Sequence, residues 1–295
     1  MKIKTCLISV YEKKNVVDLA KMLVANDVQI ISTGGTAVSL KKHGIKVISV
    51  EEITDFPEIL DGRVKTLHPK IHGGILAQRN NNEHMTTLEN HKIGPIDIVV
   101  SNLYPFKEKK EHAKNFEEII ENIDIGGSTL VRAAAKNFQN VLVLTDPDDY
   151  HLIENGLITG SFPIGLKIFL AHKAFEYSKK YESEIQNFFY ELNRSTLLSE
   201  KQKHGCPVVK INEKNTFELD LKKFSNLRYG ENPHQSAAVF VDSKNTNFKK
   251  LISSNLVGGK ELSFNNIIDA DTASNCVEML DNPACVIVKH TNPCG

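Results

Sequence analysis

The chain has 295 residues, 41% of them hydrophobic and 24% charged, a balance typical of folded globular proteins rather than disordered or membrane-embedded ones. Lys plus Arg number 36 and Asp plus Glu also number 36, so no bulk charge favours nucleic acid or an anionic membrane as a partner. The length suits roughly two domains, and no segment approaches the ~20 apolar residues of a membrane-spanning helix.

The amino terminus and the cysteines predict a cytoplasmic protein. The first apolar run is too short for a signal peptide and fits an opening strand. The five cysteines are odd in number and scattered, and they contain no CxxC pair. Reduced thiols of a cytosolic protein are the simplest interpretation.

The first half of the chain predicts a parallel α/β sheet. Short β-branched runs (TCLISV, VQIIS, KVISV, IDIVVSN and VLVLT) alternate with helical patterns, the first around residues 16–25. Such runs indicate strands that are buried on both faces. Because ligands of parallel sheets bind at the carboxyl ends of strands, we expect Ser9, residues 32–36, residues 101–104 and Thr145 at one rim.

Two segments of this half suggest an anion site. STGGT, residues 32–36, lies between a predicted strand and a predicted helix, so Gly34 and Gly35 can expose helix amides to a phosphate. A simple turn fits this motif equally well, because it is neither GxGxxG nor GxxxxGK[ST]. DGRVKTLHP, residues 61–69, adds Arg63 and Lys65, which suit a phosphate or an oxyanion. Taken alone, that loop is more simply a solvated basic turn.

A third and a fourth segment follow. SNLYPF, residues 101–106, carries Tyr104, which alternatively forms a Tyr-Pro turn that closes the strand. DIGGSTLVRAAAKN, residues 124–137, places Asp124 just before a predicted helix, with Ser128, Arg132 and Lys136 on one face of that helix. Capping by Asp124 and a favourable dipole contact of Lys136 explain these two residues equally well.

In this order, the four segments resemble the inosine monophosphate (IMP) cyclohydrolase half of the bifunctional purine biosynthesis protein family. The resemblance implies a methylglyoxal synthase-like parallel sheet domain over residues 1–147. It also implies closure of 5-formamidoimidazole-4-carboxamide ribonucleotide (FAICAR) to IMP with loss of water, without a metal or a cofactor. The substrate-binding residues that it implies are Ser9, Ser32, Thr33, Gly34, Gly35, Thr36, Arg63, Thr66, Asn102, Gly126 and Gly127.

The resemblance also assigns chemical roles. Asp124 would take or polarise a proton of the carboxamide nitrogen, which is a weak nucleophile. Lys65 and Lys136, with backbone amides, would stabilise the oxyanion and supply a proton to it. Tyr104 would hydrogen-bond the reacting groups, and Asn102 would orient the base. A helix that begins near residue 127 would place Lys136 roughly 13 Å along its axis, so convergence requires a local fold-back or a short helix.

The second half begins with a helical connection over residues 148–199, whose apolar and aromatic stripe is expected to be core. LRYGENPHQ (227–235), SFNN (263–266) and VKHTNPCG (288–295) then resemble the start of the formyltransferase half. The resemblance implies a cytidine deaminase-like α/β transformylase domain over residues 200–295. We expect this domain to be incomplete, with the strand ACVIV at an unpaired edge.

In the formyltransferase family, a formyl group moves from the cosubstrate 10-formyltetrahydrofolate to aminoimidazole carboxamide ribonucleotide (AICAR). Arg228, Tyr229 and Asn266 would contact the nucleotide, His290 would act as base, and Lys289 would stabilise the oxyanion. The simpler interpretation of His290 is a surface histidine. A zinc deaminase is disfavoured, because the glutamate of its H-x-E motif is absent after His290.

The expected ligands are purine ribonucleotides, and the family implies a homodimer. Two alternatives use the same sheet: a methylglyoxal synthase-like sensor that only binds a phosphate ligand, and methylglyoxal synthase itself. Convergence of Lys65, Tyr104, Asp124 and Lys136 beside STGGT would favour the cyclohydrolase over the sensor.

Overall fold

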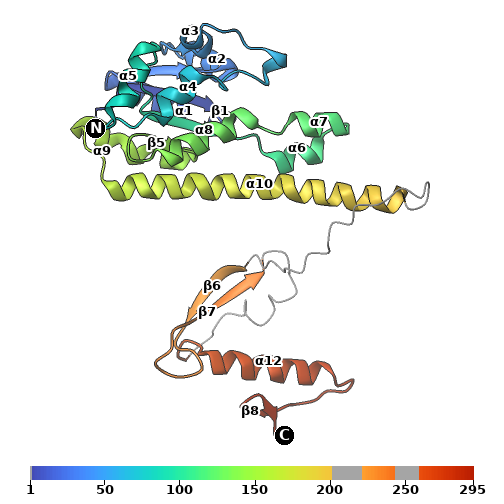
Figure 1. Cartoon of the computed structure of the whole chain (residues 1–295). Coiled ribbons are helices and arrows are strands. Elements are labelled where there is room, and N and C mark those ends of the chain that lie inside the picture. The colour runs from blue at the N-terminus through green and yellow to red at the C-terminus, as the bar shows by residue number, and fades with distance from the viewer. Residues whose placement is uncertain (1, 201–220, 243–258) are drawn as a thin grey trace. The chain divides into compact units, whose positions relative to one another are not determined.

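Figure 1 shows the computed structural model of the chain, which describes residues 2–200, 221–242 and 259–295. The chain divides into two compact units, residues 1–208 and residues 209–295. The domain boundaries predicted at residues 147 and 199 stay predictions, and Cys206 lies outside the described residues. In the part of the chain that is described, no helix is long and apolar enough to cross a membrane.

The first unit is built on a five-stranded parallel sheet with the order β3-β2-β1-β4-β5, so the predicted α/β fold is confirmed. The strands are β1 (Thr5–Val10), β2 (Gln29–Ser32), β3 (Ile48–Ser49), β4 (Ile98–Asn102) and β5 (Leu142–Leu144). Every residue of β4 is buried, as its apolar sequence predicts for a central strand. The segment KVISV forms a shorter strand than its pattern suggests, because the Ser49 side chain caps a helix that starts at Val50.

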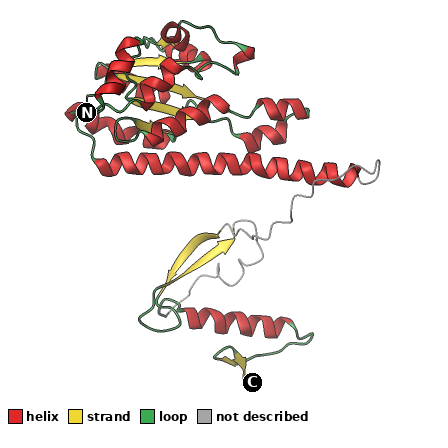
Figure 2. Cartoon of the chain, in the orientation of Figure 1, coloured by secondary structure: helices red, strands yellow, loops and turns green. Residues whose placement is uncertain are grey.

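Helices cover the sheet, and Figure 2 shows the yellow strands of this unit enclosed by red helices. The first helix begins and ends at the predicted residues. The helices are α1 (Val16–Ala25), α2 (Gly34–Lys42), α3 (Val50–Thr54), η1 (Leu60–Gly62), α4 (Pro69–Leu76), α5 (Asn82–Asn90), α6 (Phe106–His112), α7 (Phe116–Glu121), α8 (Ile125–Lys136), η2 (Pro147–Ile153), α9 (Glu154–Thr159) and α10 (Ile164–Glu200).

The strand order places a crevice at the carboxyl ends of the two central strands, β1 and β4. From β1 the chain builds outward through β2 to β3, and it then returns to build β4 and β5 on the other side of β1. The loops after β1 and β4 therefore leave in different directions. Such a reversal creates a crevice at the carboxyl ends of the strands, where ligands of α/β sheets bind.

The long helix α10 forms one side of the first unit. It packs along α8 and β5, and Figure 1 shows α6 and α7 above its second half. A small apolar cluster joins α10 to the segment after β4, through Leu103, Phe106, Tyr181 and Phe188. The predicted aromatic stripe of this helix is therefore core only in part: Tyr181 and Phe188 are buried, whereas Phe169, Phe175 and Phe189 are 44–45% exposed.

The second unit has few regular elements among its described residues. β6 (Leu221–Leu227) and β7 (Ala237–Asp242) pair antiparallel, α12 spans Phe264–Glu278, and β8 (Val288–Lys289) pairs with β9 (Asn292–Pro293). The expected strand ACVIV is found only at Val288. An apolar run forms a strand where a sheet covers it, and here Ile287 is 61% exposed.

Candidate active site

Two adjoining cavities open at the carboxyl ends of β1 and β4. Their volumes are about 600 and 160 Å³. The larger volume falls within the ~300–1,000 Å³ range of small-molecule sites. Five residues from five separate segments line both cavities: Ser9, Thr33, Lys65, Tyr104 and Asp124.

The STGGT segment forms the amino terminus of α2. Thr33 occupies the N-cap position with no side-chain cap bond, and its hydroxyl lies 3.0 Å from that of Ser9. Gly34 has a positive φ of 35°, which a side chain would strain. Because the first amides of a helix have no partner within the helix, those of Gly34 and Gly35 are available to an anion in the smaller cavity.

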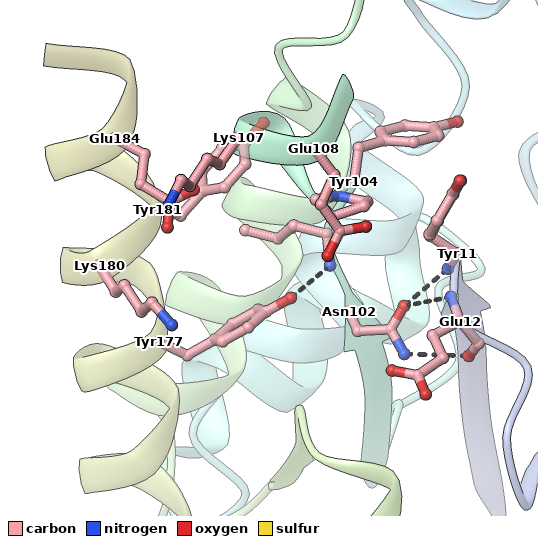
Figure 3. A pocket seen from close by; sticks show the side chains of 12 residues that line it. Tyr11, Glu12, Asn102, Tyr104, Lys107, Glu108, Tyr177, Lys180, Tyr181 and Glu184 are labelled. Atoms are coloured by element: carbon pink, nitrogen blue, oxygen red, sulfur yellow. Dashed lines mark hydrogen bonds between the residues drawn. The ribbon is translucent and has the colours of Figure 1, made fainter. Parts of the chain in front are cut away.

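Three further predicted binding residues, Ser32, Thr36 and Asn102, use their side chains in hydrogen bonds to the backbone. Ser32 is fully buried and donates to the Ile8 carbonyl at 2.7 Å, while the Thr36 hydroxyl donates to the Val10 carbonyl at 2.9 Å. Asn102 accepts the amides of residues 11 and 12 at 2.7 and 2.9 Å, as Figure 3 shows. The Asn102 contacts fix the loop after β1, whereas those of Ser32 and Thr36 hold β2 and α2 against β1. Direct substrate contacts of Ser32, Thr36 and Asn102 stay predictions.

The two cations predicted in DGRVKTLHP are both paired with carboxylates. The Lys65 Nζ lies 2.5 Å from Glu58 Oε2, and the Arg63 guanidinium binds the Glu121 carboxylate through Nε and Nη2. The Lys65 ammonium also approaches STGGT, since a Cβ at Gly34 would lie 3.3 Å from it. We did not predict either carboxylate from the sequence, because the partners come from separate loops.

Asp124 caps α8 and is half-buried at the junction of the cavities. Its Oδ1 accepts the Gly127 amide at 2.7 Å, and its own amide donates to the Tyr181 hydroxyl at 2.6 Å. Burial raises the pKa of the Asp124 carboxyl, and the Gly127 hydrogen bond offsets this only in part. A carboxylate in this environment is a stronger base than an exposed aspartate.

Tyr104 and Thr66 complete the predicted cluster. Tyr104 is 42% exposed, and its ring packs on that of Tyr11 with the ring centroids 5.0 Å apart. Thr66 is buried against the first turn of α8, where a Cβ at Gly126 would lie 3.1 Å from its hydroxyl. Both therefore place polar groups at the walls of the larger cavity.

Lys136 lies apart from this cluster. It is exposed in the last turn of α8, roughly 16 Å along the helix axis from its start at Ile125. The structure thus brings together Lys65, Tyr104 and Asp124 and does not bring Lys136 to them within one chain. The catalytic role of Lys136 stays a prediction.

In the second unit, the predicted residues gather near the first turns of α12. The Arg228 guanidinium lies over the Tyr229 ring, 4.7 Å from its centroid, and donates to the Tyr229 hydroxyl. Asn266 forms a capping box with Ser263 at the start of α12, so its side chain serves the helix. Lys289 and His290 are exposed on the β8–β9 hairpin. The Thr291 amide, in the turn of that hairpin, donates to the Asp269 carboxylate of α12 at 2.8 Å.

Across the described residues, no group of three or more His, Cys, Asp or Glu side chains is arranged to hold a metal ion.

Gly127 offers a test of how closely Asp124 is held. A Cβ there would lie 2.5 Å from Asp124 Oδ2 and 2.7 Å from Leu103 Cδ2. We expect Gly127→Ala to displace the carboxylate and to destabilise the fold by about 1–3 kcal/mol, offset in part by the better helix propensity of alanine. Thermal melting would show a lower Tm. Gly165→Ala is the matched control, because Gly165 also lies in a first helical turn and its Cβ would meet nothing within 4 Å. An equal effect of both substitutions would contradict the expectation.

Comparison with known families covers nearly the whole chain. The family model described as AICARFT/IMPCHase bienzyme matches residues 134–295, and the model of the MGS-like domain matches residues 15–129. The join between the two matches falls inside α8, so the helix that Asp124 caps links the two family patterns.

Individual relatives agree with these matches. Bifunctional purine biosynthesis protein PurH of Clostridium beijerinckii is 46% identical over 297 residues, and its counterpart in Clostridium botulinum strain 657 is 48% identical over 298 residues. Both matches cover 99% of this chain and 55% of the relative, so the chain spans about half the length of these curated relatives. The crystal structure of ForH aligns over 100% of its own chain with 64% of this chain, at 32% identity and a TM-score of 0.58.

Proposed function

This chain belongs to the AICARFT/IMPCHase bienzyme family, and we propose on that basis that its first unit closes FAICAR to IMP with loss of water. The single observation that carries the proposal is the meeting of Lys65, Tyr104 and Asp124 at two adjoining cavities. These cavities lie at the point where the strand order reverses, next to the amino termini of α2 and α8.

Asp124 is the proposed base. The carboxamide nitrogen of FAICAR attacks the formyl carbon, and it gains reactivity as it loses a proton to a carboxylate. Burial of Asp124 raises its pKa, which favours proton transfer to it. The N-cap bond to the Gly127 amide holds the carboxylate in place, so the acceptor oxygen is already positioned before substrate binds.

Lys65 and the free helix amides are the proposed anion-stabilising groups. Attack on the formyl group makes its oxygen anionic. This oxygen leaves as water after it gains two protons, one that Asp124 has taken from the carboxamide nitrogen and one from the formamido nitrogen. Positioned donors in a partly enclosed site stabilise such charge strongly. The ammonium of Lys65 is held by Glu58 close to the start of α2, where the ribonucleotide phosphate or the developing oxyanion would meet both donors.

For the complete protein we propose the preceding step as well, transfer of a formyl group from 10-formyltetrahydrofolate to AICAR. Arg228, Tyr229 and Asn266 would serve nucleotide binding there, and Lys289 and His290 the transfer chemistry. The support is the family match over residues 134–295. A homodimer in the cytoplasm, with purine ribonucleotides as its ligands, belongs to the same proposal.

Ring closure is tested by following the ultraviolet absorbance change as FAICAR is converted to IMP by the 295-residue protein. We expect catalytic turnover without added metal or folate. Product identity is checked by chromatography against authentic IMP. Tight binding of FAICAR or IMP without turnover would instead favour the sensor, and lack of both would remove the proposal.

A further inference from the structure

We propose that two tyrosines of α10, Tyr177 and Tyr181, are positioning residues of the cyclohydrolase site. They fix the relative position of two of its segments, the one after β4 and the one before α8. This inference rests on the proposed function. The two residues are four positions apart, so their side chains leave the same face of the helix. Figure 3 shows this face of α10 across a third cavity, of about 560 Å³, from the loop that carries Tyr104.

Each tyrosine hydroxyl accepts a backbone amide from a different loop of the site. The Leu103 amide, directly before Tyr104, donates to the Tyr177 hydroxyl at 2.9 Å. The Asp124 amide donates to the Tyr181 hydroxyl at 2.6 Å. One hydroxyl thus binds the backbone of Asp124, the proposed base. The other binds the backbone directly before Tyr104, the proposed hydrogen-bond donor.

Neither amide is paired by regular secondary structure. Leu103 comes directly after the end of β4, and Asp124 directly before the start of α8, so no ladder or helix bond is available to them. A buried amide without a partner is costly. The tyrosines therefore supply acceptors that the loops themselves lack.

Packing keeps the hydroxyls in place. The Tyr181 ring lies edge-on to Phe106 with centroids 6.5 Å apart, in the apolar cluster that also contains Leu103 and Phe188. Burial raises the pKa of both tyrosines, so the hydroxyls stay neutral and add no charge beside Asp124. They act as rigid neutral acceptors.

The two loops also touch each other, which links the two hydrogen bonds. A Cβ at Gly127 would meet both Leu103 and Asp124, so the segment after β4 and the start of α8 are in contact. A shift of either loop would therefore disturb the spacing between Tyr104 and Asp124. Misplacement of reacting groups by about 1 Å can cost on the order of 100-fold in rate.

The test compares Tyr181→Phe and Tyr177→Phe with Tyr150→Phe. Tyr150 is a matched control, because it is 4% exposed and its hydroxyl has no hydrogen-bond partner among the described residues. We expect each α10 variant to lower kcat about 10-fold while KM changes less than about 3-fold. The reason is that the groups at STGGT that are proposed to bind the substrate phosphate are unchanged. Tyr150→Phe should keep both constants, and melting curves would show that all three variants fold.

A double-mutant cycle separates positioning from a merely structural role. In an Asp124→Asn background no carboxylate is left to position, so the added effect of Tyr181→Phe on kcat should shrink from about 10-fold to below about 2-fold. The same fold loss in both backgrounds would overturn the inference, as would full activity of Tyr181→Phe and Tyr177→Phe. Wild-type protein without turnover would remove the proposed function itself, and the inference with it.

Discussion

Asp124→Asn is expected to lower kcat for ring closure by about 10²–10⁴-fold, the range over which a general base contributes. Asparagine retains an oxygen that can accept the Gly127 amide, so the cap of α8 should persist. It cannot take the proton of the carboxamide nitrogen. Steady-state kinetics with FAICAR measure the loss.

The same substitution is expected to leave the Tm at neutral pH unchanged or higher. Burial raises the pKa of folded Asp124 above its ordinary value of 3.8, so the folded protein binds this proton more tightly than the unfolded chain. The contribution of this group to stability is thus fully present below the ordinary pKa and is lost as the pH rises through the folded pKa. At neutral pH the ionised carboxylate opposes folding, and asparagine removes that cost.

Two measurements accompany the asparagine variant. In wild-type protein, kcat/KM should decrease on the acid side of its pH profile with an apparent pKa above the ordinary pKa of aspartate. Burial shifts the pKa of Asp124 in this direction. Asp18→Asn, at an exposed aspartate of α1, is the matched control and should leave kcat within about 2-fold. Retention of wild-type kcat by Asp124→Asn would exclude it as the base.

Lys65→Met is expected to lower kcat/KM by about 10²–10³-fold, because it removes a positioned cation from a site where negative charge develops. Methionine keeps most of the length and apolar volume of the lysine stem. Lys46→Met, at an exposed lysine between α2 and β3, is the control and should be near wild type. An effect of Lys65→Met smaller than about 3-fold would contradict the proposed role.

Substitution of Lys65 leaves the Glu58 carboxylate without its partner, and a second substitution controls for this. Without Lys65, Glu58 would place an unpaired negative charge at the larger cavity, where it would repel the substrate phosphate. The double variant Lys65→Met with Glu58→Gln should therefore have a lower KM than Lys65→Met alone, while kcat stays low. Recovery of kcat would show that Lys65 merely neutralises Glu58.

Much of the first unit could be predicted from local pattern. The buried strands follow from uninterrupted β-branched runs, and α1 from its apolar spacing, because both signals depend on residues a few positions apart. The rim position of Ser9 and Tyr104 then follows from the parallel sheet, since strand ends share one edge. The family resemblance supplied the chemical roles, which pattern alone left open.

What escaped prediction depends on contacts between distant segments. Glu58 and Glu121 reach Lys65 and Arg63 only after separate loops fold together. The aromatic stripe of α10 was predicted to be core, which holds for Tyr181 and Phe188 but not for its exposed phenylalanines. The hydrogen bonds of its two tyrosine hydroxyls were not predicted, although a pair of tyrosines four residues apart was a visible signal.

The dependence of the site on α10 also sets an order of events during synthesis. The last strand of the sheet ends at Leu144, whereas the hydroxyl that accepts the Asp124 amide arrives with residue 181, which is 181 − 144 = 37 residues later. At roughly 5–20 residues per second the ribosome needs about 2–7 seconds for that stretch. For that interval every strand of the sheet has been synthesised, but the loops at its rim still lack the acceptors that fix them. Because residues of α10 also complete the core against the sheet, the candidate site is finished only once α10 has been made.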